Sequence, residues 1–435
     1  AAAAAVAAVA AAVPRIFLSP GGSIPQVGLG TWKSQPGEVR SAVATALRAG
    51  YRHVDCAECY QNEGEVGEAL AAVLGEGVVS REEIFVTSKL WNTDHAPARV
   101  EAACRKSLRA LRLEYLDLYL IHWPVTGNRG PEVSPPLADT WRAMEGLVAA
   151  GLVRAIGVSN FSARKLEAIM EGARIMPAVN QVEHHPYCRQ DALLAFCRGH
   201  GIHVTGYSPL GSPDSSSMLK RKAPVLLEEP ALLEVAGQIN RSPAHCLIRW
   251  GLQTGCSVLP KSVSPHRIYA NLDVTSWSLP SSAMEALSSF PTQMRMVDGS
   301  FWLSPAGPYK TLGDLWDDEG EATAPCGVSP PAPAVAAVAA VAAAVPRIFL
   351  SPGGSIPQVG LGTWKSQPGE VRSAVATALR AGYRHVDCAE CYQNEGEVGE
   401  ALAAVLGEGV VSREEIFVTS KLWNTDHAPA RVEAA

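Results

Sequence analysis

The sequence of 435 residues lacks a dense block of lysine and arginine, and its formal net charge is −6. Basic patches attract nucleic acid, and polybasic segments anchor proteins at anionic membranes. We therefore expect neither a nucleic-acid partner nor a membrane partner. Because 47% of the residues are hydrophobic, the chain can bury a sizeable core. These properties favour a soluble globular protein that acts on small molecules.

The sequence also lacks a secretory signal and a run of the roughly 20 apolar residues that span a bilayer. The apolar start, AAAAAVAAVAAAVP, has no basic residues before it, and nearly the same run recurs at residues 334–346. A linker explains both runs better than a targeting segment does. The first residue is not methionine, so we expect the chain to be part of something longer, and a plastid address is an alternative to a cytoplasmic location.

The ten cysteines show no disulfide-like spacing, which favours reduced thiols in a cytosol-like compartment. Cys56 and Cys59 form a C-x-x-C motif, which can bind zinc or carry out redox chemistry. No second pair of this kind exists outside a repeated copy of the same segment. We therefore expect no metal, and we interpret both cysteines as small side chains at the end of a strand.

The chain contains a long internal repeat, because residues 336–435 match residues 4–103 letter for letter. Solenoid repeats have periods of roughly 20 to 50 residues, so this pattern indicates a duplicated domain that is cut short. Between the copies lies a segment that is first acidic and then rich in proline and alanine, as linkers are. We predict four parts: an Ala/Val-rich segment (1–13), one complete domain (14–318), a linker (319–345) and a truncated repeat of residues 14–103 (346–435).

Residues 14–318 begin with a hairpin-like segment and then alternate short β-rich runs with segments of helical period. The first helical segment places Val39, Val43, Ala46 and Leu47 on one face and ends at Gly50. Runs such as LDLYLI are apolar without alternation, as buried parallel strands are. Eight such units predict the α/β class, with a (β/α)8 TIM barrel that follows an N-terminal β-hairpin. The runs are VGLGTW, YRHVDCA, IFVTSKL, YLDLYLIHW, VRAIGVSN, PAVNQVEHH, IHVTGYSPL and CSVLPKS.

A polar residue stands at or just past the carboxyl end of seven of these runs. In a parallel barrel these ends converge on one mouth, where active sites of this architecture lie. A single polar residue at a strand end is often only a cap or a turn former, but seven together predict a site. They are Asp55, Lys89, His122, Asn160, Gln181, Tyr207 and Lys261.

Asp55, Tyr60, Lys89 and His122 suit the delivery of a proton to a carbonyl oxygen. A phenol has an ordinary pKa of roughly 10 and needs a stabilised phenolate to act as an acid near neutral pH. We expect Lys89 to provide that charge and Asp55 to keep Lys89 protonated, while His122 polarises the carbonyl. The alternative is an Asp55–Lys89 ion pair that ties two strands together, with Tyr60 merely packed beside it.

Reduction of a carbonyl also requires a hydride source, and therefore a cofactor. The usual dinucleotide fingerprint is missing, because Gly28-Leu-Gly30 has no third glycine. Lys261, Ser262 and Arg267 instead cluster at the last strand end and the start of the next helix, where a phosphate is favoured. Basic residues near a helix start are otherwise often only solvated.

From about residue 15 to about residue 316, the sequence resembles the aldo-keto reductases, and in places their plant and algal aldehyde or alcohol reductases. The family's segments stand in order and at the family's spacing: GLGTWK, HVDCAECYQNE, TSKLW, LDLYLIHWP, GVSNF, NQVEHHPY, YSPLGSPD and LPKS. The resemblance implies an eight-fold βα barrel, bound NADPH and reversible reduction of aldehydes or ketones to alcohols. It assigns the catalytic tetrad to Asp55, Tyr60, Lys89 and His122, with Tyr60 as the general acid.

The resemblance also implies how the ligands are held. The nicotinamide amide contacts Ser159, Asn160 and Gln181, and its ring stacks on Tyr207. Lys261, Ser262 and Arg267 are expected to bind the 2′-phosphate, which favours NADPH over NADH. Further cofactor contacts are expected from Thr31, Trp32, Asp55, Ser208, Leu210, Ser212, Asp214, Val263 and Asn271. The substrate pocket is expected to include Trp32, Tyr60, Trp91, His122 and Trp123.

The sequence departs from the family at one expected cofactor contact. Ala270 stands where many relatives have a glutamate that touches the adenine, which predicts weaker binding of the adenine end of the cofactor.

The second copy carries Asp387, Tyr392 and Lys421, but the counterpart of His122 would lie beyond residue 435. We expect it to be inactive by itself. A sharper hypothesis is that it competes with the first copy for the same place in the barrel, a competition that the first copy should win. We expect a monomer, and the rival function is an NADP(H)-binding regulatory or sensor subunit with little turnover.

Overall fold

The computed structural model describes residues 13–18, 22–127, 130–213, 224–318, 347–349, 355–357, 359–366, 369–409 and 411–421. The chain forms two compact units, Ala1–Pro325 and Cys326–Ala435, and each is described by itself. The expected linker and nearly all of the Ala/Val-rich start lie outside the described residues. Within the described residues, every helix is too short or too polar to serve as a membrane span.

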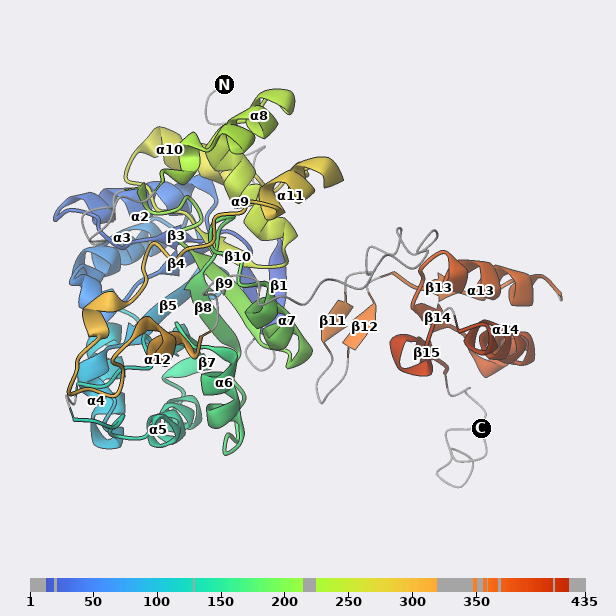
Figure 1. Cartoon of the computed structure of the whole chain (residues 1–435), viewed down its shortest axis with the longest axis horizontal. Coiled ribbons are helices and arrows are strands. Elements are labelled where there is room, and N and C mark those ends of the chain that lie inside the picture. Colours follow the sequence, from blue (N-terminus) through green and yellow to red (C-terminus); the bar gives the residue numbers. More distant parts are fainter. Residues whose placement is uncertain are drawn as a thin grey trace. The chain divides into compact units, whose positions relative to one another are not determined.

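The first unit is built on a parallel sheet of eight strands, arranged in chain order (Figure 1). The sheet closes because the segment before its first strand pairs with its last strand, through Gly28 N to Val258 O (2.9 Å) and Val258 N to Gln26 O (2.8 Å). The predicted (β/α)8 barrel is therefore confirmed. Its strands are β3 (Leu29–Gly30), β4 (His53–Asp55), β5 (Phe85–Leu90), β6 (Leu116–Ile121), β7 (Val153–Ser159), β8 (Val179–Glu183), β9 (His203–Tyr207) and β10 (Ser257–Leu259).

A helix follows each strand and packs on the outside of the barrel. The apolar face predicted for the first helix is buried, and Gly50 ends that helix with φ 111°, a left-handed conformation that favours glycine. These eight helices are α2 (Glu38–Ala49), α3 (Glu63–Gly75), α4 (Pro97–Leu111), α5 (Leu137–Ala149), α6 (Ala163–Met170), α7 (Asp191–Gly199), α9 (Pro243–Gln253) and α10 (Pro265–Leu272). Three others were not expected from the one-helix-per-strand pattern: α8 (Pro230–Gln238), α11 (Ser281–Ser288) and α12 (Leu312–Trp316).

An antiparallel hairpin of β1 (Arg15–Leu18) and β2 (Gly22–Pro25) precedes the barrel. Its Leu18 and Ile24 are fully buried in a cluster with Phe85 and Leu118, which lie near the amino ends of their strands. The hairpin therefore closes the mouth of the barrel at the amino ends of the strands. The opposite mouth, where the carboxyl ends converge, is left for a ligand.

The second unit repeats the first elements of the barrel. Within its described residues, a hairpin of β11 (Arg347–Phe349) and β12 (Ser355–Pro357) precedes a three-stranded parallel sheet. That sheet consists of β13 (Leu361–Gly362), β14 (His385–Asp387) and β15 (Phe417–Thr419), with α13 (Glu370–Arg380) and α14 (Glu395–Gly407) between the strands. Identical sequence thus produces the same local elements in both units.

Candidate active site

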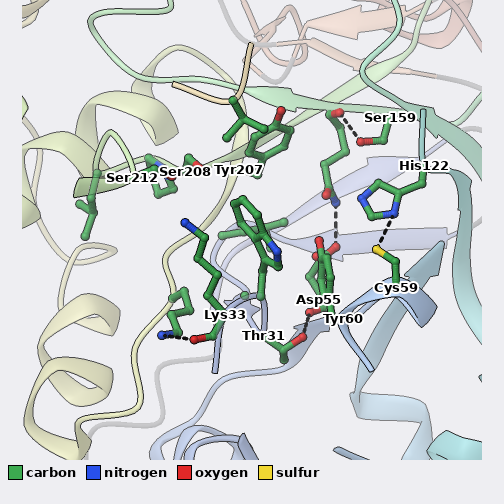
Figure 2. A pocket seen from close by; sticks show the side chains of 18 of the residues that line it. Thr31, Lys33, Asp55, Cys59, Tyr60, His122, Ser159, Tyr207, Ser208 and Ser212 are labelled. Carbon is green, nitrogen blue, oxygen red and sulfur yellow. Dashed lines mark hydrogen bonds between the residues drawn. The ribbon is translucent and has the colours of Figure 1, made fainter. Parts of the chain in front are cut away.

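A cavity of about 630 Å³ opens at the carboxyl ends of the barrel strands (Figure 2). Of the seven predicted strand-end residues, six line this cavity, and the seventh, Lys89, is fully buried beside it. The six are Asp55, His122, Asn160, Gln181, Tyr207 and Lys261. The structure therefore brings together residues that are spread over two hundred positions of the sequence.

The buried ammonium of Lys89 makes three contacts with oxygen atoms. Its Nζ donates to Asp55 Oδ1 at 2.5 Å, to the backbone oxygen of Cys56 at 2.9 Å and to the Tyr60 hydroxyl at 3.4 Å. An ammonium has three hydrogen-bond donors, so all three are used. The 3.4 Å contact is longer than the usual N–H···O hydrogen bond of about 2.7–3.2 Å, but it keeps Tyr60 within direct reach of Lys89.

Asp55 is held from two sides of the barrel. Its second carboxylate oxygen, Oδ2, accepts a hydrogen bond from Gln181 Nε2 at 2.7 Å, and Gln181 belongs to β8 across the barrel mouth. Its backbone oxygen accepts from the Thr31 hydroxyl at 2.8 Å. The carboxylate is therefore fixed between Lys89 and Gln181, and its negative charge is partly compensated.

Tyr60 ends a short 3-10 helix, η1 (Glu58–Tyr60), that follows β4. Burial, and then the negative charge of Asp55, raise the pKa of the Tyr60 phenol well above its ordinary value. In the protein alone, desolvation of the phenolate therefore dominates the pKa of Tyr60, and the stabilisation of that phenolate by Lys89 stays a prediction. Tyr60 consequently keeps its proton near neutral pH and is a hydrogen-bond donor.

His122 follows β6 and lies edge-on to Tyr60, with ring centroids 5.8 Å apart and an interplanar angle of 77°. Burial, and then the positive charge of Lys89, lower the pKa of His122 well below its ordinary value, so the ring is neutral. Its Nδ1 lies 3.5 Å from the sulfur of Cys59 (Figure 2). Cys59 lines the cavity, although we interpreted it from sequence as a structural side chain; only its place next to Tyr60 could have signalled this.

Asn160 organises the part of the cavity wall formed by β7, β8 and β9. It adopts a left-handed backbone conformation with φ 64°. Its side chain donates to the backbone oxygen of His122 at 2.9 Å and accepts from the Tyr207 hydroxyl at 2.8 Å. Ser159 donates to the backbone oxygen of Gln181 at 2.8 Å. The Tyr207 ring is thereby held at the cavity wall as a flat aromatic surface.

The far end of the cavity is polar and basic. Lys261, Ser262, Val263 and Arg267 line it, near the amino end of α10. Arg267 has no ion-pair or hydrogen-bond partner among the described residues. The predicted residues Thr31, Trp32, Ser208, Leu210 and Ser212 also line the cavity. Asn271 is buried in α10 and is not part of the described cavity lining, and Asp214 lies outside the described residues.

Aromatic side chains surround the tetrad end of the cavity. The predicted Trp32, Trp91 and Trp123 line it, and Trp302 joins them, with its ring 5.6 Å from Trp91 and 6.1 Å from Trp123. Trp302 lies in the segment after the last barrel helix, and no strand-end or periodic pattern predicted its place in the cavity. The other lining residues that we did not predict are Gly30, Lys33, Pro209, Pro213, Leu227, Leu259, Ser264, Val297 and Phe301.

The residues of this cavity suit a phosphorylated nicotinamide dinucleotide. At one end are hydroxyl and amide groups that match a carboxamide, and the Oε1 atom of Gln181 has no hydrogen-bond partner among the described residues. The ring of Tyr207 offers a surface for stacking. At the other end Arg267 is an uncompensated cation within the described residues, and backbone N–H groups at a helix start favour anions. The donor set therefore fits an amide, a flat ring and a phosphate in that order.

In the second unit, the counterparts of Asp55 and Lys89 also form an ion pair. Lys421 Nζ lies 2.8 Å from Asp387 Oδ2, but these side chains are 42% and 35% exposed, compared with 0% for Lys89 and 4% for Asp55. Lys421 Nζ lies 5.0 Å from the centre of the Tyr392 ring. The same residues thus meet without the burial that the complete barrel provides.

The chain is similar to known proteins over most of its length. The sequence model of the Aldo/keto reductase family matches residues 26–290 and 358–435. Aldo-keto reductase family 4 member C11 of Arabidopsis thaliana is 49% identical over 310 residues, which cover 69% of this chain and 97% of that protein. Aldo-keto reductase family 1 member A1 of Sus scrofa is 48% identical over 295 residues, which cover 65% and 90% of the two chains.

Solved structures give the same result. The chain is similar to a Bombyx mori aldo-keto reductase in complex with NADP, with a TM-score of 0.64 and 37% identity, over 69% of this chain and 100% of that one. It is also similar to the aldose reductase of Schistosoma japonicum, with a TM-score of 0.60 and 41% identity, over 68% and 99% of the two chains.

Proposed function

The chain belongs to the aldo/keto reductase family, and from this premise we propose that it catalyses the reversible, NADPH-dependent reduction of aldehydes and ketones to alcohols. As a member of this family it is an NADP-dependent oxidoreductase that acts on small carbonyl compounds. The observation that carries the finer proposal is the buried Lys89 ammonium, which contacts both Asp55 and the Tyr60 hydroxyl at the wall of the cavity.

Tyr60 is the proposed general acid. When hydride adds to the carbonyl carbon, the π-electron pair of the C=O bond moves to the oxygen, and the Tyr60 hydroxyl transfers its proton to that oxygen. The resulting phenolate lies against Lys89 Nζ, at the 3.4 Å seen in the structure. At an effective dielectric constant of about 20, this attraction amounts to roughly 5 kcal/mol, which offsets part of the cost of a buried phenolate.

Asp55 and His122 have supporting roles in this proposal. The contact between Asp55 Oδ1 and Lys89 Nζ keeps the buried lysine charged. His122 is neutral and donates a hydrogen bond to the carbonyl oxygen, where negative charge develops during the reaction. Neither group becomes covalently bonded to the substrate.

NADPH, when bound, supplies the hydride for this reaction. We propose that Ser159, Asn160 and Gln181 hold the carboxamide and that Tyr207 packs against the nicotinamide ring. At the other end, Lys261, Ser262 and Arg267 would bind the 2′-phosphate, which is absent from NADH. Thr31, Trp32, Ser208, Leu210, Ser212, Asp214, Val263 and Asn271 complete the proposed cofactor contacts.

The aromatic walls favour carbonyl compounds with an apolar or aromatic group. Trp32, Trp91 and Trp123 are the predicted substrate contacts, and Trp302 and Phe301 extend the same surface. Aromatic side chains bind flat apolar groups through offset or edge-to-face packing. We therefore propose that aromatic aldehydes are turned over more efficiently than small hydrophilic ones.

We propose that residues 14–318 carry the activity alone, as a monomer in a reducing, cytosol-like compartment, and that residues 346–435 are inactive by themselves. Each side chain of the proposed tetrad comes from the first unit of one chain. The nine cysteines in the described residues are free thiols. Light scattering of the purified chain tests the monomer, and expression of residues 346–435 alone tests for inactivity.

The decisive experiment mixes the purified full chain with NADPH and an aromatic aldehyde. We expect the nicotinamide absorbance of NADPH to fall as the alcohol accumulates in equal amount. Tight binding of NADPH without consumption would contradict the proposal and would support a regulatory or sensor subunit instead.

A further inference from the structure

Cys59 is the residue of the C-x-x-C motif that the reaction described above leaves unused. We propose that the Cys59 thiol donates a hydrogen bond to Nδ1 of His122 and thereby fixes the ring tautomer that presents Nε2–H to the substrate oxygen. Cys59 is then a positioning residue, because it acts through His122 and not on the substrate. The inference rests on the proposed function and adds a specific orienting group to the same site.

The geometry places the thiol at one nitrogen of the ring. Cys59 Sγ lies 3.5 Å from His122 Nδ1, a hydrogen-bonding distance for the large sulfur atom, and Figure 2 shows the two side chains pointing toward each other. Cys59 belongs to η1, immediately before Tyr60. The same short helix therefore carries both Tyr60, the proposed acid, and Cys59, the group proposed to orient His122.

Other contacts keep the ring of His122 in this orientation. Tyr60 and Trp91 both approach it edge-on, with centroid distances of 5.8 Å and 5.3 Å. Its backbone N–H donates to the oxygen of Leu90 at 3.1 Å, and its own oxygen accepts from Asn160. Nε2 has no hydrogen-bond partner among the described residues, and His122 lines the cavity. One ring nitrogen is therefore paired with Cys59, and the other is available to a ligand.

The protonation states decide the direction of the hydrogen bond. Burial raises the pKa of the Cys59 thiol to about 12, so sulfur keeps its proton. Burial and the charge of Lys89 lower the pKa of His122, so the ring carries one proton, on one nitrogen. A thiol sulfur is a weak acceptor, whereas an unprotonated imidazole nitrogen is a good one. Donation from sulfur to Nδ1 is therefore favoured, and the ring proton remains on Nε2.

This choice matters because the two tautomers present opposite groups to the substrate. With the proton on Nε2, the ring donates to the carbonyl oxygen as negative charge develops there. With the proton on Nδ1, a nitrogen lone pair would face the oxygen lone pairs and repel them. A side chain without a donor at position 59 removes the preference and allows both tautomers.

The test uses the full chain with histidine labelled with ¹⁵N, in which NMR distinguishes protonated from unprotonated ring nitrogens. A His122→Gln spectrum identifies the His122 signals by difference. Cys59→Val and Cys59→Ala both remove the hydrogen-bond donor. Valine has a bulk similar to that of cysteine, whereas alanine is smaller. Cys391→Val is the matched control, because it changes the same residue in the identical segment of the second copy.

We expect the unmodified chain to show His122 with a protonated Nε2 and an unprotonated Nδ1. Both Cys59 variants should show a mixture of tautomers and a kcat about fivefold lower, the effect of losing one neutral hydrogen bond, with an unchanged KM for NADPH. Cys391→Val should change neither the spectrum nor kcat.

A protonated Nδ1 in the unmodified chain would overturn the inference, and so would Cys59 variants with an unchanged His122 spectrum. The spectrum does not depend on turnover. A chain that shows the expected tautomer but reduces no carbonyl would therefore contradict the proposed function and leave the thiol–imidazole contact standing.

Discussion

Replacing Lys89 with methionine removes an ammonium whose side chain is 0% exposed, and we expect a large loss of barrel stability. Methionine fills a similar volume, but it leaves the Asp55 carboxylate, which is 4% exposed, without its ion-pair partner. Among the described side chains, Gln181 Nε2 remains as a hydrogen-bond donor to that carboxylate, at 2.7 Å. Removing one partner of a buried pair typically costs roughly 3–5 kcal/mol, because the other charge is left uncompensated.

The second copy supplies a matched control in the same polypeptide. Lys421→Met breaks the equivalent pair with Asp387 within identical local sequence, but there the two side chains are 42% and 35% exposed. Solvent screens such a pair, whose contribution is about 0–1 kcal/mol. We therefore expect Lys421→Met to leave the free energy of unfolding of the barrel unchanged.

Urea unfolding followed by tryptophan fluorescence measures the effect, because eight of the ten tryptophans precede residue 326 and report on the barrel. The Lys89→Met chain should unfold at a clearly lower urea concentration than both the unmodified chain and the Lys421→Met chain. A cost below about 1 kcal/mol for Lys89→Met, or an equal cost for the two substitutions, would refute the argument from burial.

A double variant separates the catalytic role of the pair from a purely structural one. Asp55→Asn combined with Lys89→Met leaves no buried charge at this position, and such replacements often recover stability. We expect stability to return largely while turnover stays lost, because no ammonium stabilises the Tyr60 phenolate. Recovery of turnover together with stability would support the alternative of an ion pair that only ties β4 to β5.

The remaining predictions concern the acid, the cofactor and pH. Tyr60→Phe should lower kcat by about 10²–10⁴-fold in an NADPH absorbance assay, while Tyr392→Phe alone should leave kcat unchanged. If the Tyr60→Phe chain keeps residual turnover and adding Tyr392→Phe abolishes it, the second copy replaces the first copy in the barrel. Arg267→Ala should raise the KM for NADPH by at least about tenfold, as expected for a lost charged hydrogen bond, and leave the KM for NADH unchanged. Burial lowers the pKa of four histidines to about 3 or 4, so they fold neutral. Below pH 6.5 these histidines bind protons in the unfolded chain but not in the folded one. The free energy of unfolding should therefore be highest above pH 6.5 and fall as the pH drops toward 4, by roughly 1 kcal/mol per histidine and pH unit. Urea midpoints between pH 7 and pH 5 measure this fall. These histidines are His53, His95, His184 and His203.

The barrel was predictable because its signals are local. Continuous apolar runs marked the strands, and period-3.6 segments ending in residues such as Gly50 marked the helices. The additional helices α8, α11 and α12 were missed because a pattern of alternating units gives no reason to expect more than one helix per strand. For α12 a signal existed, since Thr311 and Asp314 form a capping box.

The seven predicted strand-end residues lie at or beside the mouth because each follows a strand, and the topology brings those strand ends together. The side chains that were missed, such as Trp302, reach the cavity through long-range contacts that no local pattern encodes. Buried Glu183 accepts hydrogen bonds from the backbone N–H groups of Met296 and Val297, at 2.7 Å and 2.9 Å. These bonds fix the segment after the last barrel helix against the cavity, and only the folded barrel brings the two together.

The two copies show which properties of the site belong to the local sequence and which to the complete barrel. Local contacts are reproduced, since Arg48 and Arg380 bind their glutamate partners at 2.6 Å and 2.5 Å. The aspartate–lysine pair also forms in both copies, but its burial depends on the strands that follow residue 104 and on the helices that cover them. Because burial sets the cost of an unpaired charge, the same sequence encodes a buried ion pair that is costly to break in one unit and an exposed surface ion pair in the other.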